Sequence, residues 1–214
     1  MNELIAPSSE LTPEKQDIFD RLLAAKGIAA PRVSSTIPRR PTSDHTPLSH
    51  AQRRIWAFYQ LAPGTIVYHI PFAQRLSGPL HLDRLKKSLD TIARRHEILR
   101  TTFPESEGQQ IQVIAPAGTI DIPVIDLSGL SSDEREMEAH RLTTEALERP
   151  FDLASGPLMR APLLRLSPED HILLLIFHQI IYDGTSGGLL VHELAALYAA
   201  EESGQPAHLP ELSI

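Results

Sequence analysis

The sequence predicts an α/β domain, and three observations support this prediction. Helical and strand-like periodicities alternate along the chain from about residue 47. Residues 172–177 (Ile-Leu-Leu-Leu-Ile-Phe) are apolar at every position, which is typical of a strand buried on both faces. Three other strand candidates, 68–77, 119–125 and 159–166, each contain a proline, which restricts them to edges, strand starts or bulges. The strand at 172–177 is therefore expected at the centre of the sheet.

The first part of the chain is expected to lie outside the compact domain. Residues 11–27 predict a helix, because capping residues stand at both ends of an amphipathic run. Residues 28–46 are rich in proline, serine and threonine, a composition typical of an extended linker. We therefore expect a helical segment at 1–27, a linker at 28–46 and the domain at 47–214.

Several local patterns predict the elements inside the domain. Two capping boxes, Ser49 with Gln52 and Ser131 with Glu134, mark the starts of two helices. A Glu-Ser-Glu-Gly turn separates two short runs that are expected to form a hairpin. In chain order, the expected elements are a helix at 51–61, a strand at 68–77, a helix at 82–96, a hairpin at 99–103 and 109–114, a strand at 119–125, a helix at 131–148, strands at 159–166 and 171–178, and a helix at 186–201.

Composition excludes several classes of function. The 214 residues contain no cysteine, which excludes disulfides, thiolate catalysis and cysteine-ligated metals. The formal net charge of −7 argues against binding nucleic acid by neutralising phosphates. No apolar stretch is long enough to span a membrane, and no signal peptide is recognisable, so a cytoplasmic protein without membrane contact is expected. The ten histidines show no metal-ligand spacing, so no metal site is expected.

The candidate site is the corner that follows the central strand, from His178 to Gly188. A phosphate cradle is disfavoured because neither glycine-rich nucleotide-binding motif is present. The run 184–188 matches the G-x-S-x-G pattern of a serine hydrolase with Ser186 as nucleophile. That class needs an acid and then a histidine after the serine, and the remaining chain contains no aspartate. The hydrolase is therefore the weaker alternative.

A third alternative places the chemistry on an imidazole and a carboxylate. His178 at the strand end, with Asp183 and Gly184 a few residues later, could hold a base beside a structural acid. The competing interpretation is that His178 is a packed and hydrogen-bonded core residue. The spacing of these residues does not decide between the two.

Three segments resemble the nonribosomal peptide synthetase condensation domains. Residues 178–184, His-Gln-Ile-Ile-Tyr-Asp-Gly, are similar to the family's H-H-x-x-x-D-G signature. Residues 48–56 resemble its S-x-A-Q-x-R-x-W helix, and residues 95–103 resemble its R-H-E-x-L-R-T-x-F segment. The three matches occur in the family's order, and the resemblance runs from Pro47 to about Pro210.

The resemblance implies both a fold and an activity. The fold would be one chloramphenicol-acetyltransferase-like lobe, a mixed sheet with helices packed mainly on one side. The activity would be amide-bond formation between an acyl or peptidyl thioester and an aminoacyl acceptor. Both substrates would arrive on the phosphopantetheine arms of carrier proteins, and the domain itself would bind no cofactor. The chain would be the N-terminal lobe with the C-terminal lobe absent, leaving an exposed apolar face able to self-associate.

The resemblance also assigns roles at the corner. Asp183 would be a structural acid paired with Arg100, and Gly184 would let the backbone approach the substrate. His178 would be the first, mainly structural histidine, and Gln179 stands at the family's catalytic histidine. A carboxamide cannot take a proton near neutral pH, and losing a general base costs about 10²–10⁴-fold in rate. We therefore expect little or no condensation activity, and a non-catalytic carrier-binding module remains an alternative.

A cluster of arginines offers a possible docking surface for an acidic carrier protein, since local basic patches steer acidic partners. The competing interpretation is that these side chains line solvated helix faces. The cluster consists of Arg53, Arg54, Arg94 and Arg95.

Overall fold

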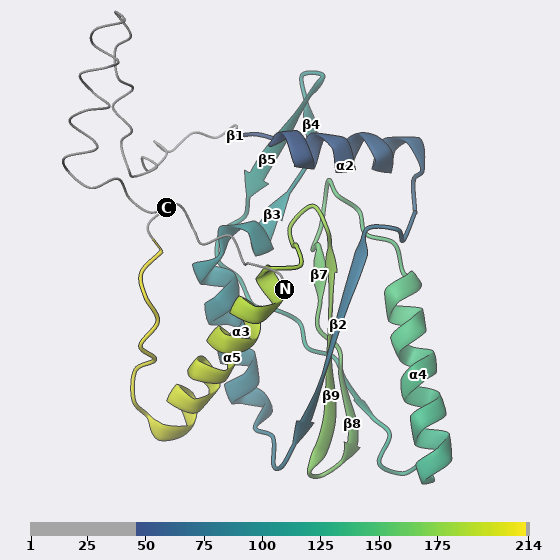
Figure 1. Cartoon of the computed structure of the whole chain (residues 1–214), viewed down its shortest axis with the longest axis vertical. Helices are drawn as coiled ribbons and strands as arrows, with labels where there is room; N and C mark the ends of the chain where they lie inside the picture. Colours follow the sequence, from purple (N-terminus) through teal and green to yellow (C-terminus); the bar gives the residue numbers. More distant parts are fainter. Residues whose placement is uncertain (1–45, 213–214) are drawn as a thin grey trace, which may run out of the picture. The chain divides into compact units, whose positions relative to one another are not determined.

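The computed structural model describes residues 46–212, so the helix expected at 11–27 and nearly all of the expected linker lie outside the described residues. The main sheet has strand order β2-β9-β8-β6, and β7 also pairs with β9 (Figure 1). Only β6 and β8 run parallel, so the sheet is mixed, as expected. The strands are β2 (His69–Ser77), β6 (Val124–Asp126), β7 (Met159–Arg160), β8 (Leu163–Ser167) and β9 (Asp170–His178).

Strand β9 lies in the interior of the sheet, which confirms the prediction for residues 172–177. It pairs with β2 along one side and with β7 and β8 along the other. Leu173, Ile176 and Phe177 have no exposed surface at all. Burying apolar side chains on both faces of one strand contributes about 1.5–3 kcal/mol for each large residue, so β9 is the main hydrophobic anchor of the domain.

Strand β2 is an edge of the sheet, and its proline fits that position. The carbonyl of Tyr68 accepts a hydrogen bond from Gln179 N, and Gly78 N donates to Glu169 O. The N–H and C=O of a residue in an antiparallel strand point the same way, so even-numbered residues of β2 face β9. Pro71 therefore points outward, where its missing N–H removes no bond from the ladder.

Two predicted strands are shorter than expected. The strand expected at 119–125 forms only over Val124–Asp126, and the one at 159–166 divides into β7 and β8. Prolines explain both differences, because Pro123 and Pro162 supply only their carbonyls, which accept from Leu163 N and Leu174 N. The alternation around Ile122 reflects burial in the core without strand pairing.

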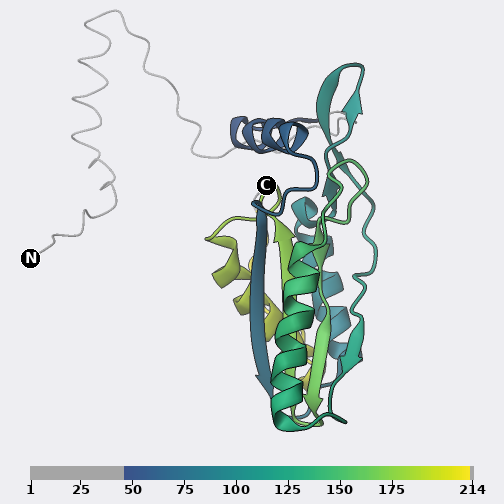
Figure 2. The same cartoon turned by 90° about the vertical axis from the view of Figure 1, so that its right-hand side faces the viewer.

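Helices cover both faces of the sheet (Figure 2). Helices α3 (Leu82–Arg95) and α5 (Ser186–Ser203) pack against each other. Helix α4 (Ser132–Glu148) lies on the opposite face, where its apolar side contacts Leu164 and Leu166 of β8. The helices therefore pack mainly on one side, as expected, and both predicted capping boxes are formed.

A small second sheet lies beside helix α2 (His50–Leu61). The predicted hairpin is present, and its turn places Glu107 and Gly108 at φ values of 53° and 73°. Leu99 and Arg100, predicted as strand, instead belong to the short 3₁₀ helix η1 (Glu97–Arg100). The strands of this sheet are β1 (Thr46–Pro47), β3 (Thr101–Thr102), β4 (Glu105–Ser106) and β5 (Gln109–Ile114).

Candidate functional site

His178 is the last residue of β9, and its side chain is only 1% exposed. Its Nδ1 accepts a hydrogen bond from Ile180 N at 3.2 Å, so the proton of the neutral ring sits on Nε2. That Nε2 has no hydrogen-bond partner among the described residues. Burial, together with the neighbouring His69, lowers the pKa of His178 to about 4. His178 is therefore a neutral core residue that holds the turn after the strand.

The aromatic surroundings of His178 explain why it stays uncharged. Four rings lie around the imidazole, with centroids 6.1–6.4 Å away, and they offer it no counter-charge. One of them, His69, is its cross-strand partner in β2 and is itself buried with a lowered pKa. The rings belong to Tyr59, Tyr68, His69 and Phe151.

Gln179 is exposed between buried neighbours on both sides. Its backbone N–H donates to the carbonyl of Tyr68 at 2.8 Å, which extends the β2–β9 pairing by one step. The chain then turns, and Ile180 and Ile181 are buried again. The corner therefore presents the side chain of Gln179 to solvent from a backbone that is held in place.

Asp183 stabilises the beginning of α5. Its Oδ1 accepts from the backbone N–H groups of Thr185 and Ser186, at 3.1 and 3.0 Å. The hydroxyls of the same two residues donate to Oδ1 at 2.8 and 2.7 Å. These bonds, led by those from the Ser186 and Thr185 side chains, lower the pKa of the Asp183 carboxyl.

The expected pairing of Asp183 with Arg100 is wrong in this structure. The Arg100 guanidinium donates instead to the carbonyl of Ala115 and to the carboxylate of Glu97. The physical reason is local to Arg100, because its guanidinium is held by Glu97 of the same 3₁₀ helix and by the carbonyl that follows strand β5. Arg100 lies in η1, where it links that helix to the end of the hairpin.

Close approach between parts of the chain requires a glycine at Gly187, while the approach of the Gly184 backbone to a substrate stays a prediction. A Cβ added at Gly184 would meet nothing within 4 Å, whereas one at Gly187 would lie 3.1 Å from the hydroxyl of Tyr182. The Tyr182 ring stacks on Phe177 with centroids 4.1 Å apart. The absence of a side chain at Gly187 therefore lets α5 pack against the corner.

The geometry of Ser186 does not suit a nucleophile. Its hydroxyl donates to Asp183 at 2.7 Å, and no histidine is among its hydrogen-bond partners in the described chain. A hydrolytic serine needs an imidazole to take its proton. The serine acts here as part of the cap of α5.

Sequence reasoning missed a buried ion-pair cluster that joins α3 to α5. Glu193 is 2% exposed and accepts from Arg95 Nε at 3.0 Å and from His96 Nε2 at 2.7 Å. The signal in the sequence was one carboxylate within the apolar run of the last helix. Arg95 is therefore engaged inside the domain, which weakens its interpretation as part of a docking surface.

A hollow in the described part of the chain lies away from the corner. It has a volume of about 1590 Å³ and is lined by α4, the 115–123 loop and residues 149–162. Arg100 borders it, but no residue of 178–184 does. The hollow therefore does not include the residues predicted to carry chemistry.

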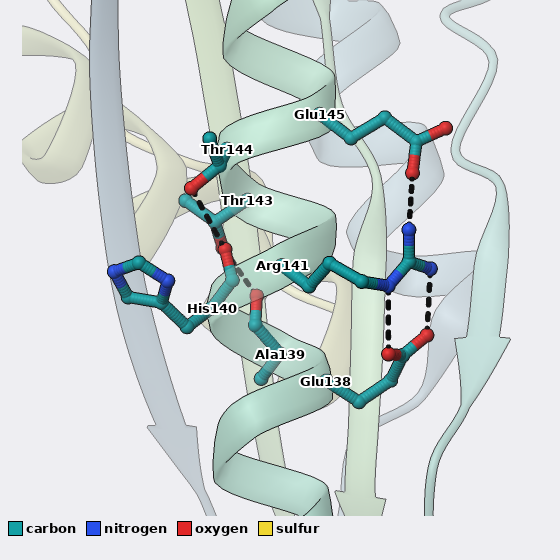
Figure 3. A network of polar contacts seen from close by, with 7 residues as sticks. All are labelled: Glu138, Ala139, His140, Arg141, Thr143, Thr144 and Glu145. Atoms are coloured by element: carbon teal, nitrogen blue, oxygen red, sulfur yellow. Dashed lines mark hydrogen bonds and ion pairs between the residues drawn. The ribbon is translucent and has the colours of Figure 1, made fainter.

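Charges along α4 pair with one another at the edge of this hollow (Figure 3). Arg141 contacts Glu138 at 2.7 Å and Glu145 at 2.8 Å, and these contacts raise the pKa of the guanidinium. Thr143 and Thr144 donate to carbonyls of their own helix. One guanidinium meets two carboxylates here, so these three side chains together carry a net charge of −1. No group of three potential metal ligands occurs within 46–212.

The fold and corner define a class, an α/β lobe in which a buried strand-end histidine precedes an aspartate-capped helix. The sequence model of the condensation domain family matches residues 42–213. The chain therefore belongs to the condensation domain family. No helix within the described residues is long and apolar enough to cross a bilayer.

Curated relatives are peptide synthetases. The chain is 42% identical to phosphinothricin tripeptide synthetase PhsC of Streptomyces viridochromogenes over 215 residues, covering 100% of this chain and 20% of that protein. It is 44% identical over 182 residues to a component of the linear gramicidin synthase of Brevibacillus parabrevis, covering 84% of this chain and 4% of that protein. The chain thus spans a fifth or less of these relatives.

Solved structures of condensation domains have the same fold. The starter condensation domain of the rhizomide synthetase RzmA matches with a TM-score of 0.72 and 26% identity, over 78% of this chain and 40% of that one. The first condensation domain of the calcium-dependent antibiotic synthetase, in complex with a substrate analogue, matches with a TM-score of 0.70 and 28% identity, over the same shares.

Proposed function

We propose that this chain is part of a condensation domain that joins an acyl or peptidyl thioester to an acceptor amine, both carried on phosphopantetheine arms of carrier proteins. The acceptor nitrogen attacks the thioester carbonyl and forms a C–N bond. The C–S bond breaks, and the sulfur leaves with the proton that the nitrogen gives up. Support comes from the synthetase relatives and from a similar starter condensation domain in complex with C8-CoA and Leu-SNAC.

The observation that carries this proposal is the exposure of Gln179 at the family's signature corner. A carboxamide accepts a hydrogen bond from an amine but cannot remove its proton near neutral pH. In this proposal Gln179 orients the acceptor amine, while His178, Asp183 and Gly184 form the corner that supports it. Arg100 supports the neighbouring hairpin. Condensation is consequently slow or absent.

The test is to restore an imidazole with Gln179→His in the synthetase that contains this domain, with donor and acceptor carriers loaded. Amide formation, followed by mass spectrometry of the intact carriers, is expected to rise about 10²–10⁴-fold. The control is Gln74→His, on an exposed glutamine of β2. A folded Gln179→His protein that forms no more amide than this control contradicts the role of the corner.

The second candidate function is a carrier-binding module without catalysis, which the glutamine at the catalytic position favours. It predicts that carrier proteins bind while no amide forms, even after Gln179→His. Surface plasmon resonance with loaded carriers, run beside the turnover assay, separates the two functions.

We also propose that residues 47–214 form the N-terminal lobe, after a helical segment at 1–27 and a linker at 28–46. The partner would be a C-terminal lobe packed on an apolar face. Leu189 and Val191 of α5 support this, because they are 49% and 39% exposed on a helix that is largely apolar. Without that lobe the face favours self-association, which sedimentation velocity of this chain would detect.

A further inference from the structure

The side-chain amide of Gln52 links three separate parts of the domain. Its Oε1 accepts from Ser49 N at 2.9 Å, which is half of the capping box of α2. Its Nε2 donates to Gln112 Oε1 at 3.3 Å, in strand β5. The same Nε2 lies 3.5 Å from the carbonyl oxygen of Ile180, inside the corner. One amide therefore joins the start of α2, the hairpin and the candidate site.

Backbone groups determine the orientation of this amide. Ser49 N–H can only donate, so it must face the oxygen of Gln52, and the Ile180 carbonyl can only accept, so it must face the nitrogen. The two hydrogens of Nε2 match its two acceptors. Gln112 extends this series of hydrogen bonds with the same donor-to-acceptor direction, since its Nε2 donates to the Pro47 carbonyl at 2.9 Å.

The peptide groups next to Gln179 make hydrogen bonds to several other parts of the domain. The N–H of Gln179 donates to Tyr68 O, and the N–H of Ile180 donates to His178 Nδ1. Ile181 N donates to the carbonyl of His178 at 3.0 Å. The Ile180 carbonyl accepts from the side-chain amide of Gln52. Gln52 thus completes the set of bonds that fixes where the Gln179 side chain points.

We propose that Gln52 is a positioning residue, which fixes the backbone of the corner and so aims the side chain at position 179 toward the reacting amine. The effect of this side-chain direction on catalysis rests on the proposed function of Gln179. The positioning itself is a property of the folded chain and is measurable without substrate.

The test is Gln52→Glu, because the two roles of Gln52 respond differently to it. A carboxylate at this position still accepts from Ser49 N, so the capping box persists. It has no hydrogen to donate to Ile180 O. Hydrogen exchange at the N–H groups of Ile180 and Ile181 is expected to be about tenfold faster, while exchange within α2 stays unchanged.

Gln60→Glu is the matched control, because it makes the same chemical change at an exposed site of the same helix. A second readout is the ¹⁵N signal of the His178 ring, which reports whether Nδ1 remains a hydrogen-bond acceptor. It is expected to shift in Gln52→Glu and not in Gln60→Glu. Equal exchange and equal ring signals in the two variants would overturn the proposal.

If Gln52→Glu fails to fold, Gln112→Leu removes one neighbour of the amide and leaves the capping box intact. Exchange at Ile180 and Ile181 is then expected to rise by a smaller factor, and no rise contradicts the proposal. If the corner loosens as expected and Gln179→His still gives no amide, the proposed function fails while the positioning stands.

Discussion

His178 and Gln179 are adjacent in the chain, yet one is sealed in the core and the other faces solvent. Extended backbone places neighbouring side chains on opposite sides, and the turn at Ile180 leaves Gln179 on the open side. The residue types alone left open whether the histidine was chemical or structural. The bond that its Nδ1 accepts from Ile180 N, its aromatic surroundings and its pKa of about 4 favour the structural role.

Two neighbouring glycines at the start of α5 give a matched prediction. Gly188→Ala is expected to stabilise the domain by about 0.5–1 kcal/mol, because alanine favours helix and a Cβ there meets nothing within 4 Å. Gly187→Ala is expected to be at least about 1 kcal/mol less stable than Gly188→Ala, because its Cβ crowds the stacked Tyr182. Urea unfolding measures both values. Equal stability of the two variants would show that Tyr182 can move aside.

At the scale of elements, a residue of strand β7 stabilises the end of helix α4. Arg160 of β7 donates to the carbonyls of Ala146 and Arg149, at 3.2 and 2.6 Å, and to that of Pro150. Its guanidinium lies 3.8 Å above the ring of Phe151. These carbonyls belong to the helix end that lacks partners, where a cation is favoured. Burial and the nearby Arg149 lower the pKa of Arg160 to about 10, so it is still charged at neutral pH.

Arg160→Met tests this helix-ending role. The methionine keeps the apolar stem but leaves the carbonyls unpaired, so the free energy of unfolding is expected to fall by about 1–3 kcal/mol. Arg165→Met is the control, since Arg165 is 45% exposed and its contact with Asp126 is 3.5 Å long. That change should cost less than about 0.5 kcal/mol. Chemical unfolding that shows equal losses in both variants would contradict the role of Arg160.

At the scale of the whole molecule, buried imidazoles couple the stability of the main sheet to pH. Burial lowers the pKa of His69, His171 and His178, and Arg160 and Arg165 add to the effect on the first two. For His171 the carboxylates of Asp170 and Asp126 act in the opposite direction. All three imidazoles lie on the paired strands β2 and β9.

The domain is therefore expected to lose stability in mild acid. An imidazole with a lowered pKa takes up its proton first in the unfolded state, so stability is full above about pH 6.5 and falls toward pH 4. His178 alone contributes up to about 3 kcal/mol to this loss. Urea unfolding between pH 7 and pH 4.5 measures the slope. His178→Asn should flatten it, whereas His140→Gln, on the surface of α4, should not; equal slopes would count against His178.

The elements that were predicted correctly are those with strong local sequence patterns. Capping boxes and the uninterrupted apolar run of β9 report bonds and burial that any fold must satisfy, so these elements were predicted well. The strand at 119–125 was overpredicted, because Ile120 and Ile122 alternate for packing while Pro123 prevents a longer ladder. Arg100 was assigned to the wrong partner, because its contacts depend on how the hairpin folds back.

The sequence by itself determined the central strand, the two capped helices, the family and the glutamine at position 179 of the signature segment. These features depend on residue type and on spacing within a few positions. Only the tertiary structure decided that His178 is buried among rings from other segments, that Glu193 pairs with Arg95, and that Gln52 reaches Ile180. Such contacts join residues far apart in the chain, and their distances are set by packing, which short-range patterns do not encode.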